Sequence, residues 1–170
     1  MFVIKDNIHI DAPIERCFLL STSLELVERE LGMRPVAGEW TTPSGQRTPL
    51  RTEGLVVGGD RVRWEGWQLG LPQVHVSLIS GWEPNRFFQD SMIVGRFKSF
   101  SHDHEFTEIG GQVLLKDTIR FDMPLGVAGR LVGKYVMLPH IRGLMARRFQ
   151  LLKRIAESEE WRHFVPFSTR

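Results

Sequence analysis

Residues 82–124 decide the fold of this chain, and they read WEPNRFFQDSMIVGRFKSFSHDHEFTEIGGQVLLKDTIRFDMP. Between Phe97 and Met123 apolar residues recur at every second position, which is typical of a strand with one buried face. Gly110 and Gly111 interrupt the run and predict a two-residue turn in which both residues adopt a positive φ. The stretch is therefore predicted to contain a β-hairpin.

The glycine turn also predicts which residues lie opposite each other, because it makes Ile109 face Gln112. Counting back from that pair gives four opposed pairs on one face: Phe106 with Leu115, His104 with Asp117, His102 with Ile119, and Phe100 with Phe121. This face is apolar except for two histidines and one carboxylate. An imidazole opposite a carboxylate, among phenylalanines, is the most informative feature of the sequence.

The overall composition is that of an ordinary globular protein, with 42% hydrophobic and 25% charged residues in 170. We expect one domain over residues 1–157 and a tail over 158–170. Cys17 is the only cysteine, which excludes an internal disulfide framework and a multi-cysteine metal site. The charged N-terminal segment and the lack of a long apolar run predict a cytoplasmic protein without integral membrane association.

The charge is unevenly distributed along the chain. Residues 120–170 carry 10 Lys+Arg against 4 Asp+Glu, whereas residues 1–119 carry 12 against 16. Such a basic region could meet nucleic acid or an anionic lipid, but a solvated helix face gives the same pattern more often. We expect no nucleic-acid partner, and a monomer or weak homodimer.

The N-terminal third begins with an alternating segment, Phe2–Ile10, which is predicted to be a strand. Asp11 is expected to cap a helix that contains Cys17, and a second short helix is expected over Leu24–Leu31. Prolines and glycines punctuate Met33–Pro49, so this segment is predicted to be a long loop, either a cavity rim or a flexible surface loop.

A meander of strands is expected next, over Arg51–Val57, Arg61–Gln68 and Gln73–Trp82. The second strand alternates so that Trp64 is buried, and the third has its valines inward and His75 on the surface. The following strand, Arg86–Val94, can present either of two faces, because a slip of one residue exchanges them. Of the two sets, Phe87, Gln89 and Ser91 or Phe88, Asp90 and Met92, we favour the second as the more apolar.

A long amphipathic helix is predicted over Val127–Glu157, with a kink or break at Pro139. Arg147 and Arg154 fall on its polar face, with Arg142 and Arg148 at the flanks. Its apolar arc contains Leu131, Tyr135, Leu138, Ile141, Met145, Phe149, Leu152 and Ala156. Beyond it, Trp161, Phe164 and Phe167 are expected either to pack back or to stay partly exposed.

Together these elements predict an α+β fold in which a curved seven-stranded antiparallel sheet wraps around one long C-terminal helix, with two short helices after the first strand. The segment Ile10-Asp11-Ala12-Pro13 followed by Phe18 resembles the start of the first helix in the START/birch-allergen-like helix-grip superfamily, SRPBCC. The motifs of residues 84–106 and 117–126 resemble its polyketide cyclase/dehydrase-like and uncharacterised bacterial members. They comprise Pro84, Phe88-x-Asp90, Gly95-x-Phe97, His102-x-His104-x-Phe106, Asp117, Phe121 and Pro124-x-Gly126.

This resemblance implies a deep, mostly apolar cavity between the sheet and the C-terminal helix. We therefore expect binding or transport of a lipid- or polyketide-like molecule, or else a cyclase, dehydratase or hydrolase reaction with the His104–Asp117 pair as general base. The pair could equally be a structural hydrogen bond. The predicted ligand-binding residues are Trp64, Phe88, Asp90, Met92, Phe100, His102, His104, Phe106, Leu115, Asp117, Ile119, Tyr135, Leu138 and Met145.

No cofactor is expected, because the sequence contains no phosphate loop, dinucleotide fingerprint or nucleophile elbow. His102, His104 and Asp117 could approach a metal ion, but we predict no metal site there. A third, weaker possibility is an interaction module that docks on a membrane or protein through its basic helix.

Overall fold

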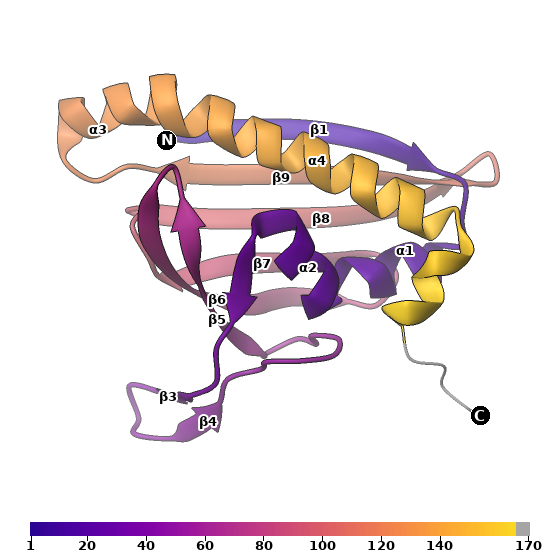
Figure 1. Ribbon diagram of the computed structural model, residues 1–170, viewed down its shortest axis with the longest axis horizontal. Coiled ribbons are helices and arrows are strands. Elements are labelled where there is room, and N and C mark those ends of the chain that lie inside the picture. Colours follow the sequence, from indigo (N-terminus) through magenta and orange to yellow (C-terminus); the bar gives the residue numbers. More distant parts are fainter. Residues whose placement is uncertain (166–170) are drawn as a thin grey trace.

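The computed structural model describes residues 1–165, in which a strongly curved antiparallel sheet covers one long helical segment (Figure 1). The seven strands of this sheet follow the order β1-β9-β8-β7-β6-β5-β2. They are β1 (Phe2–Ile10), β2 (Met33–Pro35), β5 (Arg61–Gln68), β6 (Leu71–Glu83), β7 (Phe87–Val94), β8 (Ser99–Ile109) and β9 (Gln112–Asp122). The predicted helix-grip fold is confirmed.

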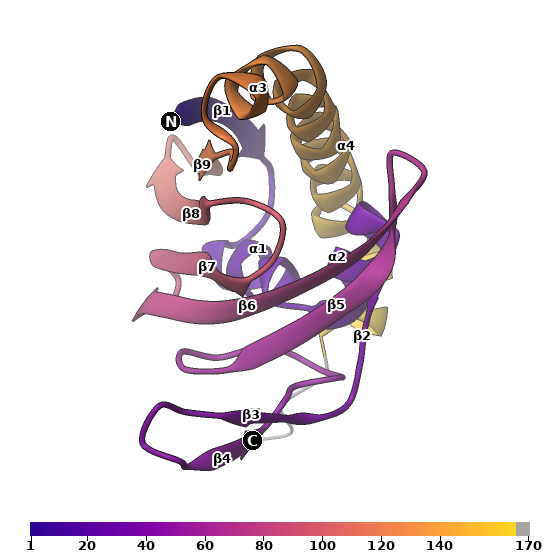
Figure 2. The ribbon, with the colours of Figure 1, turned by 90° about the vertical axis from the view of Figure 1, so that its left-hand side faces the viewer.

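Helices cover the concave face of the sheet. Figure 2 shows the sheet curling around α4 (Leu138–Ala156), with α1 (Ile14–Ser21) and α2 (Leu24–Leu31) beside it. The core lies between these layers and includes fully buried residues from both, such as Leu115 on β9 and Leu152 on α4. No helix within residues 1–165 is both long and apolar enough to span a membrane.

The hairpin between β8 and β9 has the predicted register. His104 lies opposite Asp117, and His102 lies opposite Ile119. Gly110 and Gly111 form the turn with φ of +60° and +83°, values that a residue with a side chain rarely adopts. The glycine pair thus sets the face on which both histidines lie.

The long C-terminal helix is interrupted where a break was expected. A π-helical turn, η1 (Gly133–Met137), joins α3 (Gly126–Val132) to α4. The Leu138 N–H bonds the carbonyl of Gly133, five residues back, directly before Pro139, which has no N–H to continue an α-helical ladder.

The same π turn corrects the predicted apolar arc. Leu131 and Tyr135 are 54% and 66% exposed, so they do not face the sheet. A wider turn changes the angular position of the preceding residues relative to those that follow, which separates them from the buried face of α4. Arg148, expected at the flank of the arc, is instead 7% exposed and points into the interior.

Three further expectations are corrected near the N-terminal helices and the following loop. Pro13, not Asp11, is the N-cap of α1, because the helix starts two residues later than an Asp11 cap requires. Residues 33–49 are not a continuous loop: β2 pairs with β5, and a separate hairpin joins β3 (Glu39–Thr41) to β4 (Arg47–Pro49). The segment 51–57 forms only an isolated bridge between Leu55 and Ser23.

The chain beyond α4 turns back onto the domain. A short 3-10 helix, η2 (Glu159–His163), follows, and Phe164 is buried after it. Arg154 pairs with Glu160 at 2.8 Å, and this contact connects α4 to the turn. Phe167, grouped with Phe164 in the sequence, lies outside the described residues.

Candidate functional site

A cavity of about 620 Å³ lies between the sheet and the helices that cover it. Strands β5 to β9 form one wall, and α2 and α4 form the other. Most of its lining is apolar and includes Val62, Trp64, Ile79, Phe88, Ile119 and Met145. The volume falls within the usual range for small-molecule sites, which is about 300–1,000 Å³.

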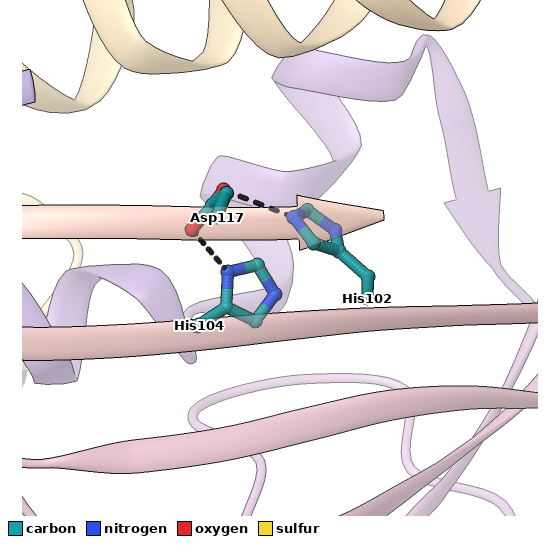
Figure 3. Close-up of side chains that lie close together, drawn as sticks. All are labelled: His102, His104 and Asp117. Carbon is teal, nitrogen blue, oxygen red and sulfur yellow. Dashed lines mark hydrogen bonds and ion pairs between the residues drawn. The ribbon is translucent and has the colours of Figure 1, made fainter. Parts of the chain in front are cut away.

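Asp117 lies at the centre of a hydrogen-bonded cluster beside this cavity. Its Oδ1 accepts from His104 Nδ1 at 3.0 Å, and its Oδ2 accepts from His102 Nε2 at 2.9 Å (Figure 3). Arg148 on α4 donates from Nη1 to the same Oδ2 at 2.9 Å. Asp117 itself is fully buried, so the carboxylate does not contact the cavity but orients the two rings that do.

Arg148 connects this cluster to α2. Its Nε lies 3.2 Å from Oε2 of Glu30, and both side chains are buried. The second oxygen of Glu30, Oε1, has no hydrogen-bond partner among residues 1–165. The sheet and both helices are therefore joined by one buried chain of charges.

The electrostatics of the cluster favour an ionised Asp117. Burial alone raises the pKa of this carboxyl, but His104, Arg148 and His102 outweigh it and hold the pKa well below its usual value. Burial, together with His102 and Arg148, lowers the pKa of His104 to about 3 despite the opposing effect of Asp117. A neutral His104 therefore donates Nδ1–H to Asp117, which leaves Nε2 as an acceptor.

Glu30 and Asp90 also line the cavity, and neighbouring groups compensate the charge of each buried carboxylate only in part. Burial raises the pKa of Glu30 to about 7, against the opposing effect of Arg148. Burial also raises the pKa of Asp90, which His75 and His102 only partly offset. The cavity thus combines apolar walls with a few carboxyl, imidazole and guanidinium groups.

Aromatic packing fixes the orientation of the histidines. The His104 ring stacks on Phe88 with ring centroids 4.3 Å apart, and the His102 and His104 centroids lie 3.8 Å apart. Phe88 and Phe106 in turn pack against Phe18 of α1. Because neighbours hold these rings on several sides, the imidazole nitrogens have defined positions.

His102, His104 and Asp117 also offer ligand atoms within 4.8 Å of one another, close enough for a metal ion. Both histidines already donate to the carboxylate, however, and Arg148 bonds one of its oxygens. A cation there would displace these bonds and approach a guanidinium. The donor set therefore fits a hydrogen-bond network better than a metal centre.

The predicted site residues separate into three groups. Trp64, Phe88, Asp90, Phe100, His102, His104, Ile119 and Met145 line the cavity. Phe106, Leu115 and Asp117 are buried behind the lining, and Leu138 is partly buried against the core. Met92, beside a register shift between β6 and β7, and the exposed Tyr135 do not line the cavity.

His75 was expected on the surface, but it lines the cavity together with Ser77. In the sheet, Trp64 lies opposite His75, and Val62 lies opposite Ser77. The connection between β5 and β6 is a two-residue turn at Leu69-Gly70, not the expected three-residue turn over residues 70–72. Because side chains alternate along a strand, this difference of one residue exchanges the two faces of β6. Recognition of that turn would have placed His75 correctly.

Arg148 and Glu30 were also missed as site residues. Each lies beside apolar neighbours on an amphipathic helix, where a charged side chain usually reaches water. Glu30 nevertheless carries a signal, because an acidic residue in the last turn of a helix opposes the helix dipole. Its position calls for a positive partner, which Arg148 supplies.

Comparison with known proteins gives structural relatives only. No protein-family model and no curated protein sequence matches the chain. Among solved structures, TTHA0849 from Thermus thermophilus is 18% identical with a TM-score of 0.62, and the match covers 89% of this chain and 97% of that one. A START superfamily protein from Mycobacterium smegmatis is 15% identical with a TM-score of 0.57, over 88% and 98% of the two chains.

The di-domain ARO/CYC StfQ from the steffimycin biosynthetic pathway is 9% identical with a TM-score of 0.66. That match covers 91% of this chain and 50% of the di-domain protein. At such identities, the likeness concerns the arrangement of the backbone. The chain thus has the helix-grip fold of the START/birch-allergen-like superfamily, as its sequence motifs predict.

Proposed function

We propose that this protein binds a hydrophobic small molecule in the cavity between the sheet and α4. The observation that carries the proposal is the cavity itself, about 620 Å³ of space with a mainly apolar lining and a few fixed polar groups. Apolar burial contributes about 25 cal/mol per Å² before the costs of association, and polar groups add orientation and specificity.

The cavity has an apolar opening that suits such a ligand. Leu69 and Leu71, in and after the β5–β6 turn, are about half exposed and also line the cavity, as does Val132 of α3. Side chains that belong both to the lining and to the surface mark where the cavity meets solvent. We place ligand uptake and release at this opening.

Turnover in the same cavity is the second candidate. Its support is the contact between imidazole and carboxylate, with His104 held by Asp117 at 3.0 Å, and the fold shared with a protein named as an ARO/CYC. Against it, a general base works best when its pKa is near the working pH, and the pKa of His104 is lowered to about 3. Binding therefore has the stronger support.

Native mass spectrometry of freshly purified protein tests the proposal. A bound molecule should appear as a defined mass increment, and it should be chemically unchanged after incubation with the protein. His104→Gln should weaken binding about fivefold, since one good hydrogen bond is worth about 1 kcal/mol. The exposed His9→Gln should bind like the parent.

Two results would contradict this proposal. Conversion of the extracted molecule by the parent, abolished in His104→Gln, would favour the enzyme. The absence of a bound molecule, together with no uptake of added apolar compounds, would show that the cavity is not a binding site.

A further inference from the structure

The polar groups of the cavity form a continuous band across the sheet. Ser77 on β6, Asp90 on β7 and His102 on β8 all line the cavity, and Asp90 lies directly opposite His102. His104 extends the band along β8, and Glu30 of α2 contributes to it from the other wall. A ligand in the cavity therefore packs against all of these residues.

Most of the free polar atoms in this band are hydrogen-bond acceptors. Asp90 Oδ1 and Glu30 Oε1 are buried, and neither has a partner in the part of the chain that the structure describes. His102 and His104 each direct one ring N–H to Asp117. A neutral imidazole that donates in this way keeps a lone pair on its other nitrogen. Ser21 Oγ, a third unpartnered atom of the lining, can donate or accept.

Two donors beside this band, Trp64 and Arg148, are engaged by the protein. Trp64 donates Nε1–H to Ser77 at 3.4 Å. Arg148 donates to Asp117 at 2.9 Å and lies 3.2 Å from Glu30, so its charge is shared between two carboxyl groups. An anionic head group would find the Arg148 guanidinium surrounded by the carboxyl groups of Glu30, Asp90 and Asp117, which repel it. Arg96, the second guanidinium of the lining, is exposed and donates to the carbonyl of Pro72.

We propose that the ligand presents a hydrogen-bond donor, a hydroxyl or amine, to the acceptor band of Asp90, Glu30, His102 and His104, and that carboxylate-headed molecules are disfavoured. This inference rests on the proposed binding function and specifies its chemistry. A ligand donor would stabilise the ionised forms of Asp90 and Glu30, which burial disfavours by raising the pKa of both carboxyl groups.

Four probes of nearly equal size test the inference by isothermal titration calorimetry. They are 1-decanol, decylamine, decanoate and 1-methoxynonane, an ether that accepts hydrogen bonds but cannot donate them. We expect 1-decanol to bind about tenfold tighter than the ether, because one donated hydrogen bond is worth roughly this factor. Decanoate should bind more weakly than 1-decanol as well.

The order of the probes separates the outcomes. Tighter binding of decylamine than of 1-decanol identifies an ammonium donor, and the reverse order identifies a hydroxyl; both support the inference if the ether and decanoate are weaker. An ether or carboxylate that binds as tightly as 1-decanol overturns the inference but leaves the binding function intact. Failure of all four probes to bind contradicts both.

Asp90→Asn gives a test within the band, since it preserves shape while placing an amide donor where an acceptor stood. The preference for 1-decanol over the ether should fall towards unity in this variant. Ser91→Ala is the matched control, because Ser91 lies on the opposite face of β7, within 3.3 Å of Ser80 Oγ. An unchanged preference in Asp90→Asn contradicts the role of Asp90.

Discussion

Replacement of Arg148 by methionine tests how strongly the buried charges depend on one another. The guanidinium is 7% exposed and lies 2.9 Å from Asp117 Oδ2 and 3.2 Å from Glu30 Oε2. Methionine fills much of the same volume, so the main loss is the charge and its hydrogen bonds. Glu30 would lose its ion-pair partner, and Asp117 would keep only the two histidines.

Removal of one partner from a buried ion pair costs about 3–5 kcal/mol. For a domain of this size, each kcal/mol corresponds to about 2–4 °C in Tm. We therefore expect Arg148→Met to melt roughly 6–20 °C below the parent in thermal denaturation followed by circular dichroism.

Arg147→Met is the matched control, since Arg147 is the preceding residue of α4 and is not buried. Its effect should stay within about 0.5 kcal/mol, as is usual for surface positions. The double variant Asp117→Asn/Arg148→Met also removes the uncompensated charge of Asp117 and should melt above Arg148→Met. Equal melting of Arg148→Met and Arg147→Met would refute the reasoning.

Two further variants test the buried positions of the helices. Burial raises the pKa of Glu30 from 4.5 to about 7, so ionisation of this carboxyl opposes folding. The free energy of unfolding of the parent, measured relative to Glu30→Gln, should therefore fall as the pH rises through this window. The expected fall is on the order of 3 kcal/mol. The exposed Glu28→Gln should follow the parent, and a parent curve parallel to that of Glu30→Gln would contradict the assignment. Met145→Asp places an unpaired charge at a position that is 2% exposed and should lower Tm by about 10 °C or more. Ala146→Asp, at the adjacent exposed position, should change Tm little. Similar melting of the two variants would show that the placement of α4 is wrong.

The hairpin and its polar pair could be predicted from the sequence because one local feature determines them. Two glycines with positive φ fix the turn, and the turn determines which residues of both strands lie on the same face of the sheet. The positions of His104 and Asp117 follow from this alternation without any knowledge of tertiary structure. The break at Pro139 is predictable for a similar reason, since the missing N–H is a property of the residue itself.

The rest of the site depends on contacts between distant segments. Arg148 and Glu30 lie 118 positions apart, and each resembles a solvated charge on its own helix. Only the approach of α2 to α4 over the sheet makes them partners. The prediction for His75 was wrong for a different reason, because a one-residue error in the preceding turn exchanges the faces of β6.

The cavity lacks packing contacts and its acceptor band lacks hydrogen-bond donors, and one ligand can supply both. An unfilled apolar space forgoes packing contacts, and each buried oxygen without a partner costs about 1–3 kcal/mol. A well-packed apolar core would avoid both costs, so folding alone does not account for Asp90 and Glu30 beside the cavity. An apolar molecule with a donor at one end would fill the space, satisfy an acceptor and, by binding only the folded state, stabilise the fold. Among the described residues, the unpartnered buried oxygens lie in the cavity lining, and this position is the strongest argument that the cavity is adapted to a ligand of this kind.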